Sequence, residues 1–104
     1  MKREELEAYR ERIAEFCRGW KIKDFAFFGS VLREDFGPGS DIDVLVAFEE
    51  DADWSLLDHV RMKEELSSIM RRRVDLVTRR GIERSENRLR REGILGTAEV
   101  YYAS

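Results

Sequence analysis

Three aspartates interrupt segments that are otherwise apolar and are predicted to be strands. Asp41 and Asp43 belong to residues 41–48, and Asp75 belongs to residues 74–78. A carboxylate in such a strand is costly when desolvated, unless a cation or hydrogen bonds compensate its charge. Positions two apart share one face of a strand, with Cα atoms roughly 6.6 Å apart. If the Asp75 strand is a neighbour, the three carboxylates would form a hard oxygen cluster that favours Mg²⁺ or Mn²⁺.

A glycine–serine pair follows the first predicted strand. Gly29 allows a tight turn, and Ser30 suits the N-cap of a short helix at 31–35. The free N–H groups and positive dipole end of a helix attract an anion, and Arg33, one turn on, can reach phosphate oxygens. Two metal ions beside a bound triphosphate would lower the pKa of an attacking hydroxyl and neutralise a departing pyrophosphate. The combination predicts phosphoryl-transfer chemistry.

The remaining sequence predicts the elements that position these residues. Helical spacing of apolar residues predicts helices at 3–18 and 54–70, and an arginine-rich helix is expected at about 83–92. Strands are predicted at 22–28, 41–48, 74–78 and 97–103. We therefore expect one α/β (α+β) domain over residues 1–104, in which helices flank a mixed sheet in the order α-β-α-β-α-β-α-β.

Composition limits the functions that are possible. With 104 residues the chain can build one core, which excludes a two-domain enzyme. No apolar run reaches the roughly 18 residues of a membrane helix, and no signal-peptide pattern follows the charged start, so we expect a cytoplasmic protein without a membrane partner. A single cysteine, Cys17, cannot form an internal disulfide or a multi-cysteine metal site.

Charge is unevenly distributed along the chain. The 19 basic and 22 acidic side chains give a net charge of −3, yet residues 71–91 hold nine arginines against three acids. Arginines at helix ends are commonly solvated and interact with the helix dipole. The alternative is that this segment docks an acidic partner or phosphates through forked guanidinium groups.

Four segments together carry a family resemblance, namely residues 28–33, 37–46, 73–77 and 98–102. Their pattern resembles the signature of the minimal nucleotidyltransferase (MNT) family in the DNA polymerase beta-like superfamily. The resemblance implies a magnesium-dependent nucleotidyltransferase that moves AMP from ATP to an acceptor hydroxyl and releases pyrophosphate. It also implies an antitoxin of a toxin–antitoxin module, with a HEPN-type toxin as partner and a toxin tyrosine as acceptor.

The same resemblance suggests a role for each matching residue. The assignments are Asp41, Asp43 and Asp75 as catalytic ligands of two Mg²⁺ ions (Mn²⁺ being possible), and Gly29, Ser30, Arg33 and Ser40 as nucleotide-binding residues. Asp75 is also a candidate proton acceptor. One departure from the family pattern is Glu34-Asp35, which places negative charge near the expected phosphates and would weaken ATP binding unless these side chains point away.

Two other functions remain open from the sequence. The chain could neutralise a toxin by binding alone, without catalysis, or it could transfer the nucleotide to a small molecule such as an aminoglycoside. A short chain leaves little material for a second substrate pocket, so we expect a partner protein, or a homo-oligomer, to complete the acceptor site. No direct nucleic-acid partner is expected.

Overall fold

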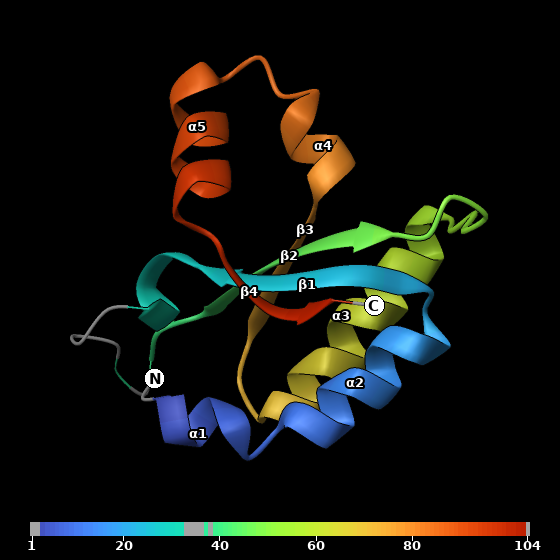
Figure 1. The fold of residues 1–104 in the computed structure, drawn as a ribbon, viewed down its shortest axis with the longest axis vertical. Helices are drawn as coiled ribbons and strands as arrows, with labels where there is room; N and C mark the ends of the chain where they lie inside the picture. Colours follow the sequence, from blue (N-terminus) through green and yellow to red (C-terminus); the bar gives the residue numbers. More distant parts are fainter. Residues whose placement is uncertain (1–2, 33–36, 38, 104) are drawn as a thin grey trace.

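A four-stranded mixed sheet crosses the middle of the molecule (Figure 1). The computed structural model describes residues 3–32, 37 and 39–103. The strands are β1 (Ile22–Phe28), β2 (Ile42–Phe48), β3 (Val74–Thr78) and β4 (Glu99–Ala103). They lie in the order β3-β2-β1-β4, in which β1 pairs antiparallel with β2 and β4, while β2 pairs parallel with β3. The predicted mixed sheet of an α/β (α+β) protein is confirmed.

Helices lie on both sides of this sheet (Figure 1). The helices are α1 (Arg3–Glu7), α2 (Arg10–Gly19), α3 (Leu56–Met70), α4 (Arg79–Glu83) and α5 (Arg88–Thr97), and a 3-10 turn, η1 (Gly29–Leu32), follows β1. In the view of Figure 1, α2 and α3 lie below the sheet, whereas α4 and α5 stand above it. Because β2 and β3 are parallel, the chain must cross between opposite ends of the sheet, and α3 makes this crossover.

Side-chain burial follows the alternation of the strands. The larger core faces α2 and α3, and its members include Ile13, Phe25, Phe27, Ile42, Val44, Val46, Met62 and Leu66. The smaller cluster lies on the opposite face and consists of Ala26, Phe28 and Leu45 with Ile82 of α4 and Ile94 of α5. Along β2, Ile42, Val44 and Val46 belong to the larger core and Leu45 to the smaller cluster, so the sheet has one face with a large core and one with a small core.

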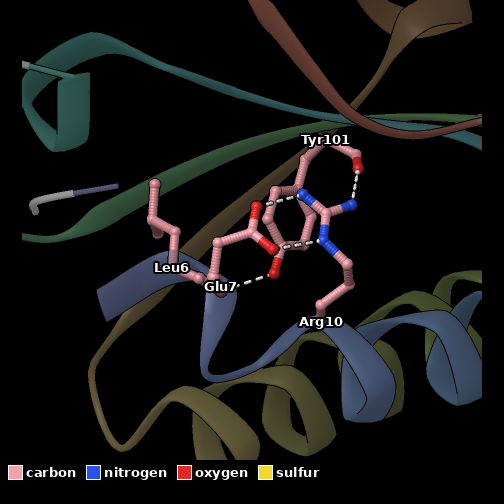
Figure 2. A network of polar contacts seen from close by, with 4 residues as sticks. All are labelled: Leu6, Glu7, Arg10 and Tyr101. Atoms are coloured by element: carbon pink, nitrogen blue, oxygen red, sulfur yellow. Dashed lines mark hydrogen bonds and ion pairs between the residues drawn. The ribbon is translucent and has the colours of Figure 1, made fainter. Parts of the chain in front are cut away.

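The N-terminal helix is broken where the sequence predicts a continuous one over 3–18. In an unbroken helix the Leu6 carbonyl would accept the N–H four positions on. Here it accepts the Tyr9 N–H at 3.1 Å and also the hydroxyl of Tyr101, which is 95 positions away (Figure 2). The prediction of one helix was therefore wrong, because a distant side chain on β4 takes the carbonyl that would have continued it.

Arg10 connects this break to the edge strand β4 (Figure 2). Its Nε donates to Glu7 at 2.7 Å, and its Nη1 donates to the Tyr101 carbonyl at 2.9 Å. The guanidinium carbon lies 4.3 Å from the centre of the Tyr101 ring, which itself packs edge-on against Phe27 at 5.0 Å. The hydrogen bond to Glu7 raises the pKa of Arg10, so this cation persists at any working pH. The break between α1 and α2 is thereby fixed to β4.

The arginine-rich helix predicted at 83–92 has different bounds in the structure, where residue 83 ends α4, residues 84–87 form a connection and α5 begins at Arg88. The hydroxyl of Thr78 accepts the Gly81 N–H at 3.0 Å and starts α4 directly after β3. The side chain of Asn87 accepts the Arg90 N–H at 3.1 Å and starts α5. Asparagine bonds more favourably to free N–H groups at a helix start than within a helix, which explains the break.

The other predicted bounds are close to those observed. β1 and β3 begin and end as predicted, while β2 starts one residue later than predicted and α3 and β4 start two residues later. The short helix expected at 31–35 is in part the turn η1, which begins at Gly29, and residues 33–36 lie outside the described part of the chain. Within the described ranges, no helix is both long and apolar enough to cross a membrane.

Candidate functional site

Asp43 and Asp75 start from neighbouring positions of the sheet. They are register partners in the parallel pair of β2 and β3, and Asp43 is also the partner of Phe28 on β1. Register partners project from the same face of a sheet. Because Phe28 packs with Ile82 and Ile94, that face is the one beneath α4 and α5. The two carboxylates therefore lie on the face with the smaller core.

Asp41 lies directly before β2, two positions from Asp43, so the alternation directs it toward the same face. Asp41 and Asp75 are exposed, whereas Asp43 is half-buried. The Ile42 N–H donates to the Arg73 carbonyl at 2.9 Å, which holds the starts of β2 and β3 side by side. All three aspartates singled out in the sequence thus lie at one end of two adjacent strands.

Gly29 fits closely against one of these carboxylates. Its φ of 70° lies in the left-handed region, which glycine adopts without a steric penalty. A Cβ atom added at this position would stand 2.5 Å from Oδ2 of Asp43, well inside van der Waals contact. The turn after β1 is therefore built around the Asp43 carboxylate, and the structure brings together two features that the sequence suggested separately.

The donor set suits a hard divalent cation, because carboxylate oxygens are the ligands that Mg²⁺ and Mn²⁺ prefer. Among the described residues, however, no three His, Cys, Asp or Glu side chains converge closely enough to hold an ion as they stand. Asp41, Asp43 and Asp75 therefore fit a metal by their chemistry and by their backbone positions, and side-chain rotation is needed for them to share one. They are the residues that would hold it.

The loop before β2 is held by hydrogen bonds to its own backbone and to α3's C-terminal flank. The Ser40 hydroxyl accepts the Gly37 N–H at 3.3 Å, and the Ser40 N–H donates to the Gly37 carbonyl at 3.1 Å. The same carbonyl accepts Nη1 of Arg72 at 2.9 Å. Ser40 thus shapes the turn that leads to Asp41, and its expected contact with nucleotide stays a prediction.

The other predicted nucleotide-binding residues are only partly described. The backbone of Ser30 belongs to η1, next to Gly29. Arg33 lies outside the described residues, as do Glu34 and Asp35. Their expected effects on phosphate binding therefore stay predictions.

Arg72 was missed as a site residue by the sequence reasoning. It belongs to a run of three arginines that reads as a charged helix end, and nothing in that local pattern indicates its target. In the structure its guanidinium reaches a carbonyl 35 positions earlier in the chain. By bonding to Gly37 it joins the end of α3 to the loop that presents the aspartates.

Two residues of reactive types have structural roles. His59 on α3 places Nε2 3.0 Å from the Leu76 carbonyl, so it bonds to the backbone of the edge strand β3. Cys17 is buried in the larger core, and burial raises the pKa of its thiol to about 12. Since the thiolate is the reactive form of cysteine, Cys17 is chemically inert near neutral pH.

Comparison with known proteins gives a consistent set of relatives. The family described as nucleotidyltransferase domain matches residues 10–96. Protein adenylyltransferase MntA of Thermococcus cleftensis is 32% identical over 78 residues, which cover 75% of this chain and 74% of that protein. A provisionally named protein adenylyltransferase of Methanocaldococcus jannaschii, MJ1215, is 34% identical over 76 residues, covering 73% of this chain and 86% of the relative. The chain spans only 63% of the length of MJ1379 from the same organism, at 36% identity.

Solved structures have the same fold. One provisionally named a minimal nucleotidyltransferase is 40% identical, covers 95% of both chains and superposes with a TM-score of 0.72. A toxin–antitoxin crystal structure with AMP-PNP gives a TM-score of 0.71 at 20% identity, over 91% of this chain and 73% of that one. At that identity the second likeness concerns the fold alone.

The fold and these relatives define the class of protein as nucleotidyltransferases with a small α+β domain. The matched region covers most of the sequence, from the first residue of α2 to the last residue but one of α5. The chain belongs to the nucleotidyltransferase domain family and, within it, to the minimal nucleotidyltransferases.

Proposed function

We propose that the protein transfers AMP from ATP to a hydroxyl group of a partner protein in a Mg²⁺-dependent reaction. The observation that carries the proposal is the contact between Gly29 and Asp43, together with the register pairing of Asp43 and Asp75. A turn suited to phosphates is thus in contact with one carboxylate of an acidic pair. The adenylyltransferase names of the relatives support ATP as the nucleotide.

The reaction follows from the chemistry of these groups. The acceptor hydroxyl oxygen forms a bond to the α-phosphorus, the bond from that phosphorus to the bridging oxygen breaks, and pyrophosphate leaves. The hydroxyl proton passes to Asp75 and then to solvent. Divalent ions, when bound, supply positive charge that stabilises the developing negative charge on the phosphates. Gly29 and Ser30 would orient the β- and γ-phosphates through backbone N–H groups.

We further propose that the acceptor is a tyrosine of a HEPN-type toxin and that the protein acts as its antitoxin. Proteins with the same fold occur in toxin–antitoxin complexes, one of which contains a tri-AMPylated HEPN toxin of Shewanella oneidensis bound to an MNT antitoxin. The small size of this chain supports a macromolecular acceptor, because few residues remain to surround a second small substrate.

The test is transfer of label from α-³²P-ATP to the candidate toxin in the presence of Mg²⁺. Asp43→Asn should lower the rate roughly 10³-fold, because it removes one charged ligand from the phosphoryl-transfer site. Asp53→Asn is the matched control, since it makes the same chemical change in an exposed loop residue outside the strands, and it should keep the parent rate.

Each alternative function predicts a different result. Full activity in Asp43→Asn would refute the proposed site. If the parent protein forms a tight complex with the toxin but neither it nor any variant labels the toxin, the protein is an antitoxin that acts by binding. Labelling of an added aminoglycoside in the absence of protein acceptor would identify a small-molecule nucleotidyltransferase.

A further inference from the structure

The connection between α4 and α5 concentrates positive charge on a projecting part of the molecule. This segment, residues 84–91, is called the α4–α5 tip here, and it lies at the top of Figure 1, remote from α2 and α3. It carries four arginines and one glutamate, a net charge of +3. The remaining residues hold 15 basic and 21 acidic side chains, a net charge of −6. The tip is thus a basic site on an acidic molecule.

The structure separates the tip from the other arginines of the segment 71–91. Arg71 ends α3 in a left-handed conformation with φ 56°, and Arg72 bonds to the loop before β2. Arg84, Arg88 and Arg90, in contrast, have exposed side chains in the tip, where Arg88 also forms a solvent-exposed ion pair with Glu92 at 2.9 Å. Arg71 and Arg72 thus have roles at the end of α3 and in the loop before β2, whereas the three exposed arginines of the tip are candidates for a binding role.

The tip is shaped by its own hydrogen bonds. The Arg91 Nη1 donates to the Ser85 carbonyl at 2.9 Å, and the Asn87 N–H donates to the Ser85 hydroxyl at 3.2 Å. The Asn87 side chain caps the first turn of α5. These bonds fix the backbone that carries the exposed arginines, so a partner would meet a preorganised surface and would lose less conformational entropy on binding.

An apolar side chain lies among these charges. Leu89 is 84% exposed, the highest value among the large apolar residues identified as exposed. It stands between Arg88 and Arg90 in the first turn of α5. An exposed apolar side chain beside arginines suits a protein contact in which the leucine enters an apolar hollow and the arginines meet carboxylates around it.

The tip belongs to the two helices that cover the face of the candidate site. Ile82 of α4 and Ile94 of α5 pack with Phe28, whose register partner is Asp43. A protein bound at the tip would consequently approach the molecule from the side on which the carboxylates lie.

We propose that the α4–α5 tip docks the acceptor protein through an acidic surface patch that surrounds an apolar hollow. This inference rests on the proposed function for the identity of the bound protein as acceptor. The remainder of the chain has a net charge of −6, so the long-range field of the molecule favours the approach of an acidic partner at the tip.

Nucleic acid is the less suitable occupant. A polyphosphate backbone would extend beyond the tip over the acidic body, including the loop 49–53 with its four carboxylates. Single-stranded nucleic acid is typically held by aromatic stacking, and residues 84–91 contain no aromatic side chain.

The experiment measures binding and does not depend on catalysis. A fluorescently labelled glutamate–tyrosine copolymer serves as acidic polypeptide probe, and its affinity is followed by fluorescence anisotropy at increasing salt. The triple charge reversal Arg84→Glu, Arg88→Glu and Arg90→Glu should weaken binding at least about tenfold and reduce the salt dependence. Leu89→Ser should weaken binding about threefold with unchanged salt dependence, because it removes apolar contact and no charge.

The control reverses three exposed cations on the opposite side of the sheet, Arg12, Arg18 and Lys63 of α2 and α3. This variant has the same net charge as the tip variant and should keep most of the affinity. Circular dichroism checks that both variants are folded. If the tip variant is not folded, the same three arginines are changed to glutamine instead.

Three outcomes would overturn the inference. They are equal losses in the tip and control variants, unchanged binding in the tip variant, and tighter tip-dependent binding of a labelled single-stranded RNA than of the acidic copolymer. If the copolymer binds through the tip but no protein is ever labelled with AMP, the proposed function fails while the docking surface stands.

Discussion

Replacement of Gly29 by alanine tests the close contact on which the proposed site depends. The φ of 70° at this residue costs about 1 to 2 kcal/mol for a residue with a Cβ atom. The added Cβ would lie 2.5 Å from Oδ2 of Asp43, whereas ordinary contact begins at 3.4 Å, so the carboxylate must move by 3.4 − 2.5 = 0.9 Å. The added Cβ also restricts the rotation through which the Asp43 carboxylate would come to share a metal, and a misplacement of about 1 Å at a reacting centre reduces the rate about 10²-fold.

Two measurements check this reasoning. The melting temperature should fall by about 4 to 8 °C for each kcal/mol of lost stability in a domain of this size. The rate of AMP transfer per folded molecule should fall about 10²-fold. Gly19→Ala is the matched control, because a Cβ there meets nothing within 4 Å. It should leave the rate unchanged and the stability equal or higher.

The result that would refute the argument is a Gly29→Ala protein with the parent rate of transfer. Such a protein would mean either that the Asp43 carboxylate is not held by the turn or that it takes no part in the reaction. A loss of stability without a loss of specific activity would support the strained backbone alone and would leave the contact between Gly29 and Asp43 without a catalytic role.

Two further predictions concern the scaffold. Tyr101→Phe removes the hydroxyl bonded to the Leu6 carbonyl; it should cost about 1 kcal/mol in urea unfolding and speed amide exchange in α1, and unchanged exchange there would contradict the role given to this bond. Ser55→Ala removes the capping box of α3 and should cost about 1 kcal/mol. The hydrogen bonds from Ser55 lower the pKa of Asp58, so their stabilisation is present above the ordinary aspartate pKa and is lost as the pH falls through the lowered value. Because alanine keeps the backbone N–H that also donates to Asp58, the stability difference between parent and Ser55→Ala should shrink in acid only by the part that the hydroxyl contributes, and a constant difference would refute the bond from the hydroxyl to Asp58.

Most of the sheet could be predicted from local patterns in the sequence. β1 and β3 are rich in apolar residues and are bounded by turn or charged residues, and their bounds are as predicted. The breaks in the helices could not be predicted in this way. The bond from Tyr101 to Leu6 joins residues 95 positions apart, so no local window contains the cause of the break between α1 and α2.

The candidate site likewise has features that local sequence patterns predict and features that depend on contacts between distant residues. The spacing of Asp41 and Asp43 and the apolar context of Asp75 are visible in the sequence. That Asp43 and Asp75 are register partners depends on the order of the strands, which the sequence could state only as a condition. Residue types alone do not predict the contact of Gly29 with Asp43 or the bond from Arg72 to Gly37. Both depend on the path of the folded backbone.

The position of β4 beside β1 has a consequence for the order of folding. The nearest register partners of β1 and β2, Phe28 and Asp43, are 15 positions apart, while those of β1 and β4, Phe27 and Glu99, are 72 apart. Closing the longer loop costs about 1.4 kcal/mol more entropy, from three-halves RT times the logarithm of 72/15. The antiparallel pair of β1 and β2 should hence assemble early, with one flank of β1 open until the final strand arrives. During that interval β4 of a second molecule could occupy the open flank, which makes strand exchange the misassembly to which this topology is most exposed.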